Sequence, residues 1–449
     1  MTRKRNVMAD GARSDDAAVQ AQLDRLATLG AGGDILGLER VAALLDRLDN
    51  PERSLPPVFH VAGTNGKGST CAFLRAALEA AGHKVHVFTS PHLVRFNERI
   101  RLAGRLIDDV TLAAYLRRVI DIAEGSGASF FEVTTAAALL AFAEVPADAC
   151  VIEVGLGGRL DATNVIASPA VTGIAQLGLD HQGFLGDKLE LIAAEKAGIA
   201  KRGVPLVTQR YPPRIAERVA EISSRAGAEL YPRGASWDAA PYRGKLHYRD
   251  LDGKIDVPMP RLAGAHQALN AALAIAMLRH QQAVSVPTAA MRAAMGWADW
   301  PARMQPLGAG PLRDLLPRDA ELWLDGGHNP AAARVVADHL RAAVPDGKPL
   351  HLVMGLLANK DATGVLRAFA GRHATLHAVP VPGHDYHAPA DLAAQAKHAG
   401  LTAMPATDVA DALGWIGRHA DRAAPPFVLV LGSLYLAGEV LRENRQLPD

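Results

Sequence analysis

The sequence predicts an α/β protein whose first domain is built on a mostly parallel sheet. Two observations lead to this prediction. Short apolar runs alternate with helical segments up to about residue 230, and such alternation is typical of a parallel sheet covered by helices. The glycine-rich segment GTNGKGST at residues 63–70 follows one of these apolar runs and precedes a helical segment. That order of strand, turn and helix is the order found in phosphate-binding loops.

Composition and charge exclude several classes of protein. The chain has 449 residues, which is enough for two or three domains with cores of their own. The 48 Lys and Arg residues nearly balance the 47 Asp and Glu residues, so no broad positive field is available for nucleic acid. Only two cysteines occur, Cys71 and Cys150, which favours a reducing compartment. With neither a secretory signal nor a membrane-length apolar run, we expect a cytoplasmic protein without nucleic-acid or membrane partners.

The first domain is predicted to cover residues 17–306, after a disordered polar tail at residues 1–16. Residues 17–50 show helical spacing, and residues 230–262 are expected to form a short antiparallel excursion. Strands are predicted at residues 58–61, 84–89, 149–154, 170–174 and 205–208. Helices are predicted at residues 70–81, 111–124, 134–144, 189–198, 215–226 and 264–283.

The second domain is predicted to cover residues 307–449 and to be a smaller, Rossmann-like α/β domain. The Gly- and Pro-rich residues 307–312 are expected to be the linker and hinge between the domains. Strands are predicted at residues 321–324, 350–354, 375–379 and 427–431, with helices between them. This domain has no glycine-rich phosphate loop of its own.

The glycine-rich segment predicts a nucleotide site at the end of the first strand. Glycines let the main chain approach an anion, and Lys67 adds positive charge at the β- and γ-phosphate oxygens. The segment departs from the strict G-x-x-x-x-G-K-[ST] pattern, because Val61 occupies the position of the first glycine and Gly68 separates Lys67 from Ser69. This departure disfavours an ordinary GTPase or kinase. The alternative interpretation is a tight structural turn.

Polar residues at other predicted strand ends are candidate metal ligands. Glu153 leaves a buried strand into a loop with three glycines, where a carboxylate costs desolvation unless it meets a cation. A turn with a solvated glutamate is the alternative. The hydroxyl oxygen of Ser90 can be a ligand of Mg²⁺, although Ser90 alone is better explained as a capping residue. His181 is an unusual magnesium ligand and alone is better explained as a hydrogen-bonded histidine.

Lys196 shares a predicted helix face with Leu189, Ile192 and Ala193. It should therefore point inward, where an ammonium group is costly and its pKa falls. A neutral inward amine can form hydrogen bonds, pair with Glu195, or react with CO₂ to give a carbamate. Physical chemistry alone favours the ion pair.

Further polar candidates lie later in the chain. Asn270 offers a donor and an acceptor to a base edge or a phosphate, or is a buried polar residue satisfied by neighbouring backbone. Arg303 can reach phosphate in a closed form, although most arginines near linkers are solvated. Polar loops at residues 325–330, 359–361 and 432–435 each follow a strand of the second domain. Three such loops at one sheet predict a shared ligand site.

These segments together resemble the folylpolyglutamate synthase/dihydrofolate synthase family, within the wider Mur ligase superfamily. They occur in the family's order over roughly residues 34–440, and the long segment at residues 153–164 is specific to this branch. Gly327, where the family often has Ala, and Met304-Gln305 depart from the pattern. The segments that carry the resemblance are GTNGKGST at 63–70, TSPHL at 89–93, FNERI at 96–100, FFEVTT at 130–135, EVGLGGRLDATN at 153–164, LDHQGFLG at 179–186, EKAGI at 195–199, HQALNA at 266–271, DGGHNP at 325–330 and GSLYLAGEV at 432–440.

The resemblance implies a role for each candidate. Two Mg²⁺ ions per site are implied, and Lys196 matches a carbamylated lysine that faces the second one. The implied metal ligands are Ser90, Glu153 and His181. For Ser90 and His181 the resemblance thus reverses the preference stated above, which was for a capping serine and a hydrogen-bonded histidine. The implied catalytic residues are Lys67, Lys196 and His328. The implied ATP contacts are Thr64, Asn65, Gly66, Lys67, Gly68, Ser69, Asn270, Arg303 and Asp325. The implied contacts to a pterin-bearing substrate are Ile35, Leu36, Gly37, Leu38, Ser129, Phe130, Phe131, Glu132, Leu160, Asp161 and Ala162, and glutamate would meet His328 and Ser433.

The implied reaction is the ligation of L-glutamate to dihydropteroate and to folates that already carry glutamate. ATP would convert a carboxylate to an acyl phosphate, which the amine of glutamate then attacks. Closure of the two domains would keep water from this intermediate. The resemblance also favours a monomer. The alternatives are a monofunctional folylpolyglutamate synthase, a peptidoglycan-precursor ligase, which residues 130–135 and 153–164 disfavour, and a nucleotide-binding switch without ligase activity.

Overall fold

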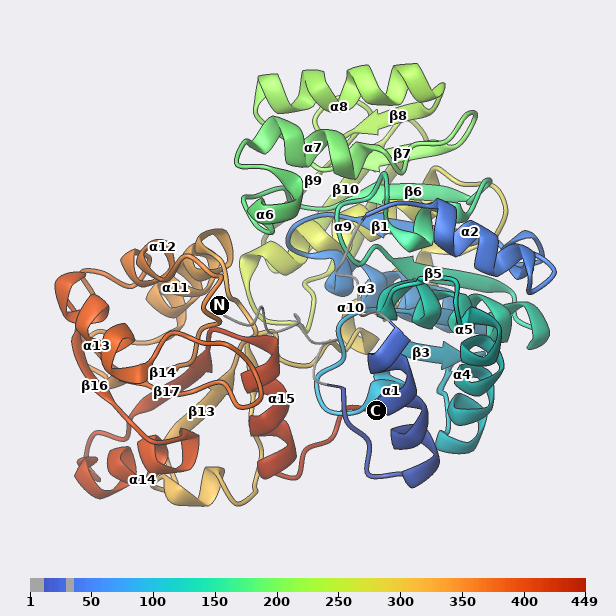
Figure 1. Cartoon of the computed structure of the whole chain (residues 1–449). Helices are drawn as coiled ribbons and strands as arrows, with labels where there is room; N and C mark the ends of the chain where they lie inside the picture. Colours follow the sequence, from blue (N-terminus) through green and yellow to red (C-terminus); the bar gives the residue numbers. More distant parts are fainter. Residues whose placement is uncertain (1–11, 30–35) are drawn as a thin grey trace. The chain divides into compact units, whose positions relative to one another are not determined.

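The computed structural model describes residues 12–29 and 36–449, which form two compact units (Figure 1). The first unit contains the described residues up to Arg261 together with Gln267–Asp299, and the second contains Leu262–His266 and Trp300–Asp449. Both units are α/β, as predicted. Residues 307–312, predicted as the linker, belong to the second unit. The predicted tail up to residue 11 and the candidate substrate contact Ile35 lie outside the described residues.

The first unit is built on an eight-stranded, mostly parallel sheet in the order β4-β3-β2-β5-β1-β6-β7-β8. β1 (Val58–Ala62) lies in the middle and pairs in parallel with β5 (Ala149–Glu153) and β6 (Val171–Ile174). All five predicted strands occur within one residue of their expected bounds. The other strands of this sheet are β2 (Val85–Phe88), β3 (Ile100–Leu102), β4 (Arg105–Leu106), β7 (Pro205–Thr208) and β8 (Glu229–Pro232).

Helices cover this sheet, and two of them begin three or more residues earlier than predicted. α3 begins at Lys67, because Gly66 takes a positive φ of 86° and turns the chain from the loop directly into the helix. α5 begins at Phe130, because Ser129 and Glu132 cap each other's backbone N–H groups. The helices are α1 (Ala17–Leu29), α2 (Glu39–Asp46), α3 (Lys67–Ala80), α4 (Asp109–Ala123), α5 (Phe130–Glu144), α6 (Gln182–Leu185), α7 (Leu189–Ala197), α8 (Pro213–Ala226), α9 (Ala265–Arg279) and α10 (Thr288–Trp297), with short 3₁₀ turns η1 (Pro51–Arg53), η2 (Phe96–Arg99) and η3 (Ala162–Val165).

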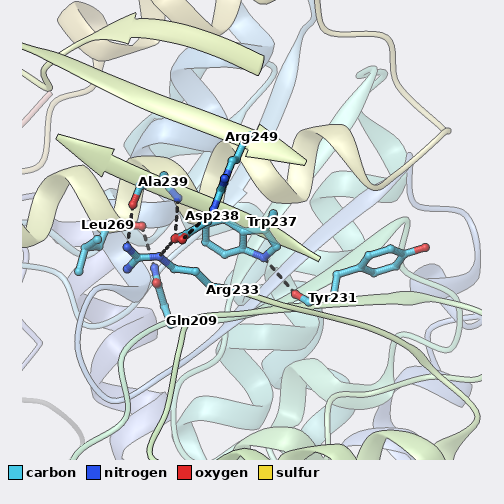
Figure 2. A network of polar contacts seen from close by, with 8 residues as sticks. All are labelled: Gln209, Tyr231, Arg233, Trp237, Asp238, Ala239, Arg249 and Leu269. Atoms are coloured by element: carbon cyan, nitrogen blue, oxygen red, sulfur yellow. Dashed lines mark hydrogen bonds and ion pairs between the residues drawn. The ribbon is translucent and has the colours of Figure 1, made fainter. Parts of the chain in front are cut away.

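The predicted antiparallel excursion is a separate three-stranded sheet in the order β11-β10-β9. Its first strand is anchored to β8: the indole N–H of the buried Trp237 donates to the Tyr231 carbonyl at 3.0 Å (Figure 2). Trp237 also stacks on Tyr248, and Arg233 pairs with Asp238 at 3.0 Å. The strands are β9 (Trp237–Tyr242), β10 (Lys245–Asp250) and β11 (Gly253–Pro258).

The second unit contains a six-stranded sheet in the order β12-β13-β17-β14-β15-β16. Apart from the antiparallel edge strand β12, its strands are parallel, so the loops after β13, β17 and β14 reach the same edge. The four predicted strands are confirmed. The strands are β12 (Gln305–Pro306), β13 (Glu321–Leu324), β14 (Leu350–Met354), β15 (Ala374–Ala378), β16 (Thr402–Pro405) and β17 (Phe427–Leu431), and the helices are α11 (Pro330–Ala343), α12 (Ala362–Arg367), α13 (Pro389–His398), α14 (Val409–His419) and α15 (Leu434–Glu443), with the 3₁₀ turn η4 (Arg313–Leu315).

Among the described residues, no helix combines the length and the apolar character needed to cross a membrane.

The ion pair of Asp250 and Arg279 yields a stability prediction. The Asp250 side chain is fully buried and accepts a hydrogen bond of 2.6 Å from Arg279 in α9. Arg279→Met would leave a buried carboxylate without its cation, so we expect a loss of about 3–5 kcal/mol in the free energy of unfolding. Urea denaturation measures this loss. The control is Arg261→Met at the exposed pair with Asp299, which should cost less than about 1 kcal/mol. Equal losses in the two variants would contradict the prediction.

Candidate active site

The glycine-rich loop joins the middle strand β1 directly to the N-terminus of α3. Its backbone is held by the segment after β6, because the N–H groups of Thr64 and Asn65 donate to the Gln176 carbonyl at 2.9 and 3.1 Å. A Cβ atom on Gly63 would lie 2.9 Å from the Ala175 side chain, so only glycine fits there. The free N–H groups of the first helical turn therefore meet at a fixed point, which suits an anion.

Lys67 and Glu153 lie together at the ends of two adjacent strands. Val61 near the end of β1 is paired in register with Glu153 at the end of β5. The Lys67 ammonium donates to the Gly63 carbonyl at 3.1 Å and lies 3.9 Å from the Glu153 carboxylate. Glu153 is buried. Lys67 is thus the cation that compensates the buried carboxylate in this structure.

The other two candidate metal ligands come from neighbouring segments. Ser90 follows β2, which pairs in parallel with β5, so Ser90 and Glu153 lie at the same edge of the sheet. His181 precedes α6 and is exposed, with a positive φ of 50°. No group of three or more His, Cys, Asp or Glu side chains within residues 12–29 and 36–449 is arranged to hold a metal ion. The metal role of this set, which combines one carboxylate, one imidazole and one hydroxyl, therefore stays a prediction.

Lys196 points inward from α7, as its position on the helix predicts. Burial, and then the positive charge of Lys67, lower the pKa of Lys196 to about 7, although Asp180 and Glu195 oppose this shift. The carboxylate of Glu195 instead accepts hydrogen bonds of 3.0 and 2.8 Å from the guanidinium of Arg159. The ion pair that physical chemistry favoured for Lys196 is therefore not the arrangement observed.

The loop of residues 154–164 packs closely against α7. A Cβ atom on Gly158 would lie 2.7 Å from the Glu195 carbonyl oxygen and 3.0 Å from the Lys196 Cα atom. The N–H group of Arg159 donates to the same Glu195 carbonyl at 2.8 Å. The loop that contains three of the candidate substrate contacts thus lies against the helical turn that carries Lys196.

The candidate substrate contacts on α5 divide into two kinds. Glu132 is buried, and its carboxylate already has protein partners. It accepts a hydrogen bond from the Ser129 N–H and two hydrogen bonds, of 2.8 and 3.1 Å, from the Arg40 guanidinium. Phe131 faces the glycine loop, since a Cβ atom on Gly155 would lie 2.4 Å from its ring. Phe130 is buried nearby. Sequence reasoning missed Arg40, and its position on α2 gave no local signal.

The other residues predicted to contact the pterin-bearing substrate lie in two segments. Leu36, Gly37 and Leu38 lead into α2, whose first residue is Glu39. Leu160 and Asp161 lead into η3, which begins at Ala162, and Asp161 caps that turn by accepting from the Thr163 N–H. No ligand contact of these residues is tested by the structure, so their roles stay predictions.

Asn270 lies over the start of α3. A Cβ atom on Gly66 would come within 2.4 Å of the Asn270 Oδ1 atom. The Asn270 side chain is buried and donates to the Gln267 side chain at 3.0 Å. The amide therefore borders the phosphate loop and has a side-chain partner rather than the backbone partner of the second interpretation, and its contact with a nucleotide stays a prediction.

In the second unit, several candidates surround Gly326. Asp325 is buried and accepts from the N–H groups of Gly327 at 2.7 Å and Met304 at 2.9 Å. A Cβ atom on Gly326 would lie 2.6 Å from the guanidinium of Arg303. The ring of His328 interacts with the Gly326 carbonyl at 3.1 Å.

Three further features of the second unit bear on this arrangement. His266 was overlooked as a candidate; burial lowers its pKa to about 4, opposed by Asp325. Ser433 follows β17 and caps α15 by accepting from the Tyr435 N–H at 3.1 Å. Residues 379–388 after β15 also reach this edge, since the His387 ring contacts the Lys360 carbonyl at 3.0 Å.

Comparison with known proteins identifies both parts of the chain. The family model of the Mur ligase middle domain matches residues 61–278, and the model of the dihydrofolate synthetase C-terminal domain matches residues 311–443. The dihydrofolate synthase/folylpolyglutamate synthase of Escherichia coli K12 is 33% identical over 409 residues, which are 90% of each chain.

Solved structures agree with these matches. E. coli FolC in complex with DHPP and ADP has a TM-score of 0.85 and 31% identity, and the match covers 94% of this chain and 97% of that one. A bifunctional folylpolyglutamate synthase/dihydrofolate synthase with Mn, AMPPNP and L-glutamate bound has a TM-score of 0.83 and 31% identity, with coverage of 96% and 99%. The chain belongs to the dihydrofolate synthase/folylpolyglutamate synthase family.

Proposed function

We propose that the protein is an ATP- and Mg²⁺-dependent ligase that joins L-glutamate to dihydropteroate and to folates that already carry glutamate. The observation that carries this proposal is the 3.9 Å approach of Lys67 to Glu153 beside the N-terminus of α3. It combines a cradle for phosphate with a buried carboxylate for a cation. The E. coli relative bears the names of both activities, and the solved relative with Mn, AMPPNP and L-glutamate holds the matching reactants.

The phosphate loop supplies positive charge to the reaction. A carboxylate is a poor electrophile toward an amine, so ATP first converts it to an acyl phosphate. The N–H groups of the first turn of α3 and the ammonium of Lys67 stabilise the charge of the phosphoryl group during transfer. The neutral amine of glutamate then attacks the acyl carbon, and phosphate leaves as the amide forms. We assign further nucleotide contacts to Asn270, Arg303 and Asp325.

The donor set at the edge of the first sheet fits a divalent cation. The buried Glu153 carboxylate beside the phosphate loop is the kind of oxygen ligand that Mg²⁺ prefers. We assign Ser90 and His181 as its companions. When bound, the ion neutralises charge on the phosphate oxygens.

Lys196 is proposed to carry a carbamate that serves a second ion. With a pKa of about 7, a large fraction of its amine is neutral at physiological pH, and only the neutral amine attacks CO₂. The nitrogen bonds to the CO₂ carbon and one N–H proton leaves to water. The product is an inward-facing carboxylate on α7.

The second unit is proposed to hold the incoming glutamate through His328 and Ser433. His328 follows β13 and Ser433 follows β17, and these strands are paired neighbours in the sheet. We also propose that the enzyme acts as a monomer in the cytoplasm. Cys71 and Cys150 are buried free thiols, which suits a reducing compartment.

A monofunctional folylpolyglutamate synthase is the alternative, since it would use the same loop and the same cation. Phosphate release can be measured with ATP, glutamate and either dihydropteroate or tetrahydrofolate. The proposal expects release with both acceptors. Release with tetrahydrofolate alone would select the alternative, and no glutamate-dependent release at all would indicate a nucleotide-binding protein without ligase activity.

The same assay tests the role of Lys67. Lys67→Ala removes the ammonium that faces phosphate, and we expect turnover to fall at least about 10²-fold. The variant should stay folded but with a lowered unfolding temperature, because the buried Glu153 carboxylate loses the ammonium beside it. The control is Lys84→Ala, which changes an exposed lysine before β2 and should leave turnover unchanged. Activity of Lys67→Ala at the wild-type level would remove the loop from the mechanism.

The carbamate on Lys196 predicts chemical rescue. Lys196→Ala should lose turnover, and a small added carboxylate such as acetate should restore part of it by occupying the vacated position. Lys188→Ala, at the exposed start of α7, should behave like the wild type with or without acetate. Kinetics of Lys196→Ala equal to those of the wild type would rule out a role beside the metal.

A further inference from the structure

A buried chain of hydrogen bonds connects the middle strand of the first sheet to the loop of residues 154–164. His60 in β1 is fully buried, and its Nε2 atom lies 2.8 Å from the Thr163 hydroxyl. That hydroxyl donates to the Asp161 carboxylate at 2.5 Å. The other oxygen of Asp161 accepts from the N–H group of Leu156 at 2.8 Å.

One arrangement of protons satisfies this chain. Burial raises the pKa of Asp161, and the N–H groups that donate to both of its oxygens, one of them the N–H of Thr163 at 3.0 Å, oppose this rise, so we treat the group as a carboxylate. The hydroxyl of Thr163 has one proton and gives it to Asp161. Its oxygen must then accept from the N–H of His60, which makes His60 a neutral ring protonated at Nε2. Burial lowers the pKa of His60 to about 3, which agrees with a neutral ring.

The chain attaches the loop at a second place. Near its middle, Gly158 and Arg159 contact the Glu195 carbonyl of α7 directly. Near its end, Thr163 and Asp161 connect the loop to β1 through His60. The segment between these two attachments contains Leu160, which has little freedom to move independently.

We propose that His60 and Thr163 are positioning residues for the pterin-bearing substrate, because they fix Asp161 and thereby the surface that residues 160–162 present to it. Neither residue needs to touch the substrate, since both side chains are fully buried. This inference rests on the proposed function, in which residues 160–162 contact the pterin end of dihydropteroate.

The test removes the hydroxyl and restores it. Thr163→Val keeps the shape of the side chain but cannot bridge His60 and Asp161, whereas Thr163→Ser keeps the hydroxyl. For Thr163→Val we expect the KM for dihydropteroate to rise about tenfold, the effect of losing one hydrogen bond to a charged group. The KM for ATP should change less than about twofold, because the phosphate loop is held separately by Gln176. Thr163→Ser should recover most of the wild-type KM.

His60 provides an independent pair of variants. In His60→Gln, the side-chain amide can place an N–H donor near the former Nε2 position, so the KM for dihydropteroate should stay near that of the wild type. His60→Leu should resemble Thr163→Val. If the two residues act through one chain, His60→Leu combined with Thr163→Val should raise this KM no further than either substitution alone.

A matched control separates positioning from stability. Thr172 in β6 is also fully buried, and its hydroxyl donates to the Pro205 carbonyl at 3.1 Å. Thr172→Val should lower the unfolding temperature without changing the KM for dihydropteroate. If Thr163→Val lowers the unfolding temperature and leaves this KM unchanged, the proposal is overturned. If Thr163→Val does not fold, the comparison of His60→Gln with His60→Leu decides. Failure of the wild type to use dihydropteroate would instead overturn the proposed function.

Discussion

The charge pair of Lys67 and Glu153 is the interaction on which the rest of the first unit depends. The buried carboxylate of Glu153 and the partly exposed ammonium of Lys67 lie 3.9 Å apart because β1 and β5 are parallel neighbours and α3 begins immediately after the loop. The Glu153 carboxylate cannot lose a compensating cation in the interior without a large desolvation cost. In the proposed reaction, phosphate becomes the partner of Lys67 and a cation becomes the partner of Glu153. Binding thus exchanges one set of compensated charges for another.

Close packing keeps this pair and its surroundings in place. The phosphate loop is bonded to the segment after β6, and the loop after β5 is attached both to α7 and to β1. Glycines permit these approaches, since a Cβ atom on Gly63 or Gly158 would overlap its neighbours. The groups that meet the reactants are therefore set by the sheet and its helices, which limits the reorganisation needed during the reaction.

Much of this arrangement could be predicted from the sequence because it follows from local patterns. The mostly apolar runs that form β1, β5 and β6 are buried along their whole length and bounded by turn residues, as expected of buried parallel strands. Parallel order then places the polar residues after them at one edge of the sheet. The short strands β3 and β4, with three and two residues, carry too little periodicity to be recognised.

Contacts between distant segments could not be predicted in this way. The partner of Glu132 is Arg40, 92 residues earlier, and the partner of Thr163 is His60, 103 residues earlier. No spacing rule connects such positions. The prediction of an ion pair between Lys196 and Glu195 was wrong for the same reason. The Glu195 carboxylate pairs instead with Arg159, which is far from it in the sequence. Residues 307–312, predicted as the linker, lie within the second unit, whose long segment begins at Trp300. Residues 262–266 also join the second unit, although their neighbours in the sequence on both sides belong to the first.

A crystal structure of the protein with Mg²⁺ and AMPPNP tests the central claim most directly. The account predicts the β- and γ-phosphates within hydrogen-bonding distance of the N–H groups of residues 67–69, the Lys67 ammonium turned toward them, and a cation on the Glu153 carboxylate. A nucleotide bound elsewhere, or one seated on the loop while Lys67 and Glu153 remain paired with each other alone, would contradict it.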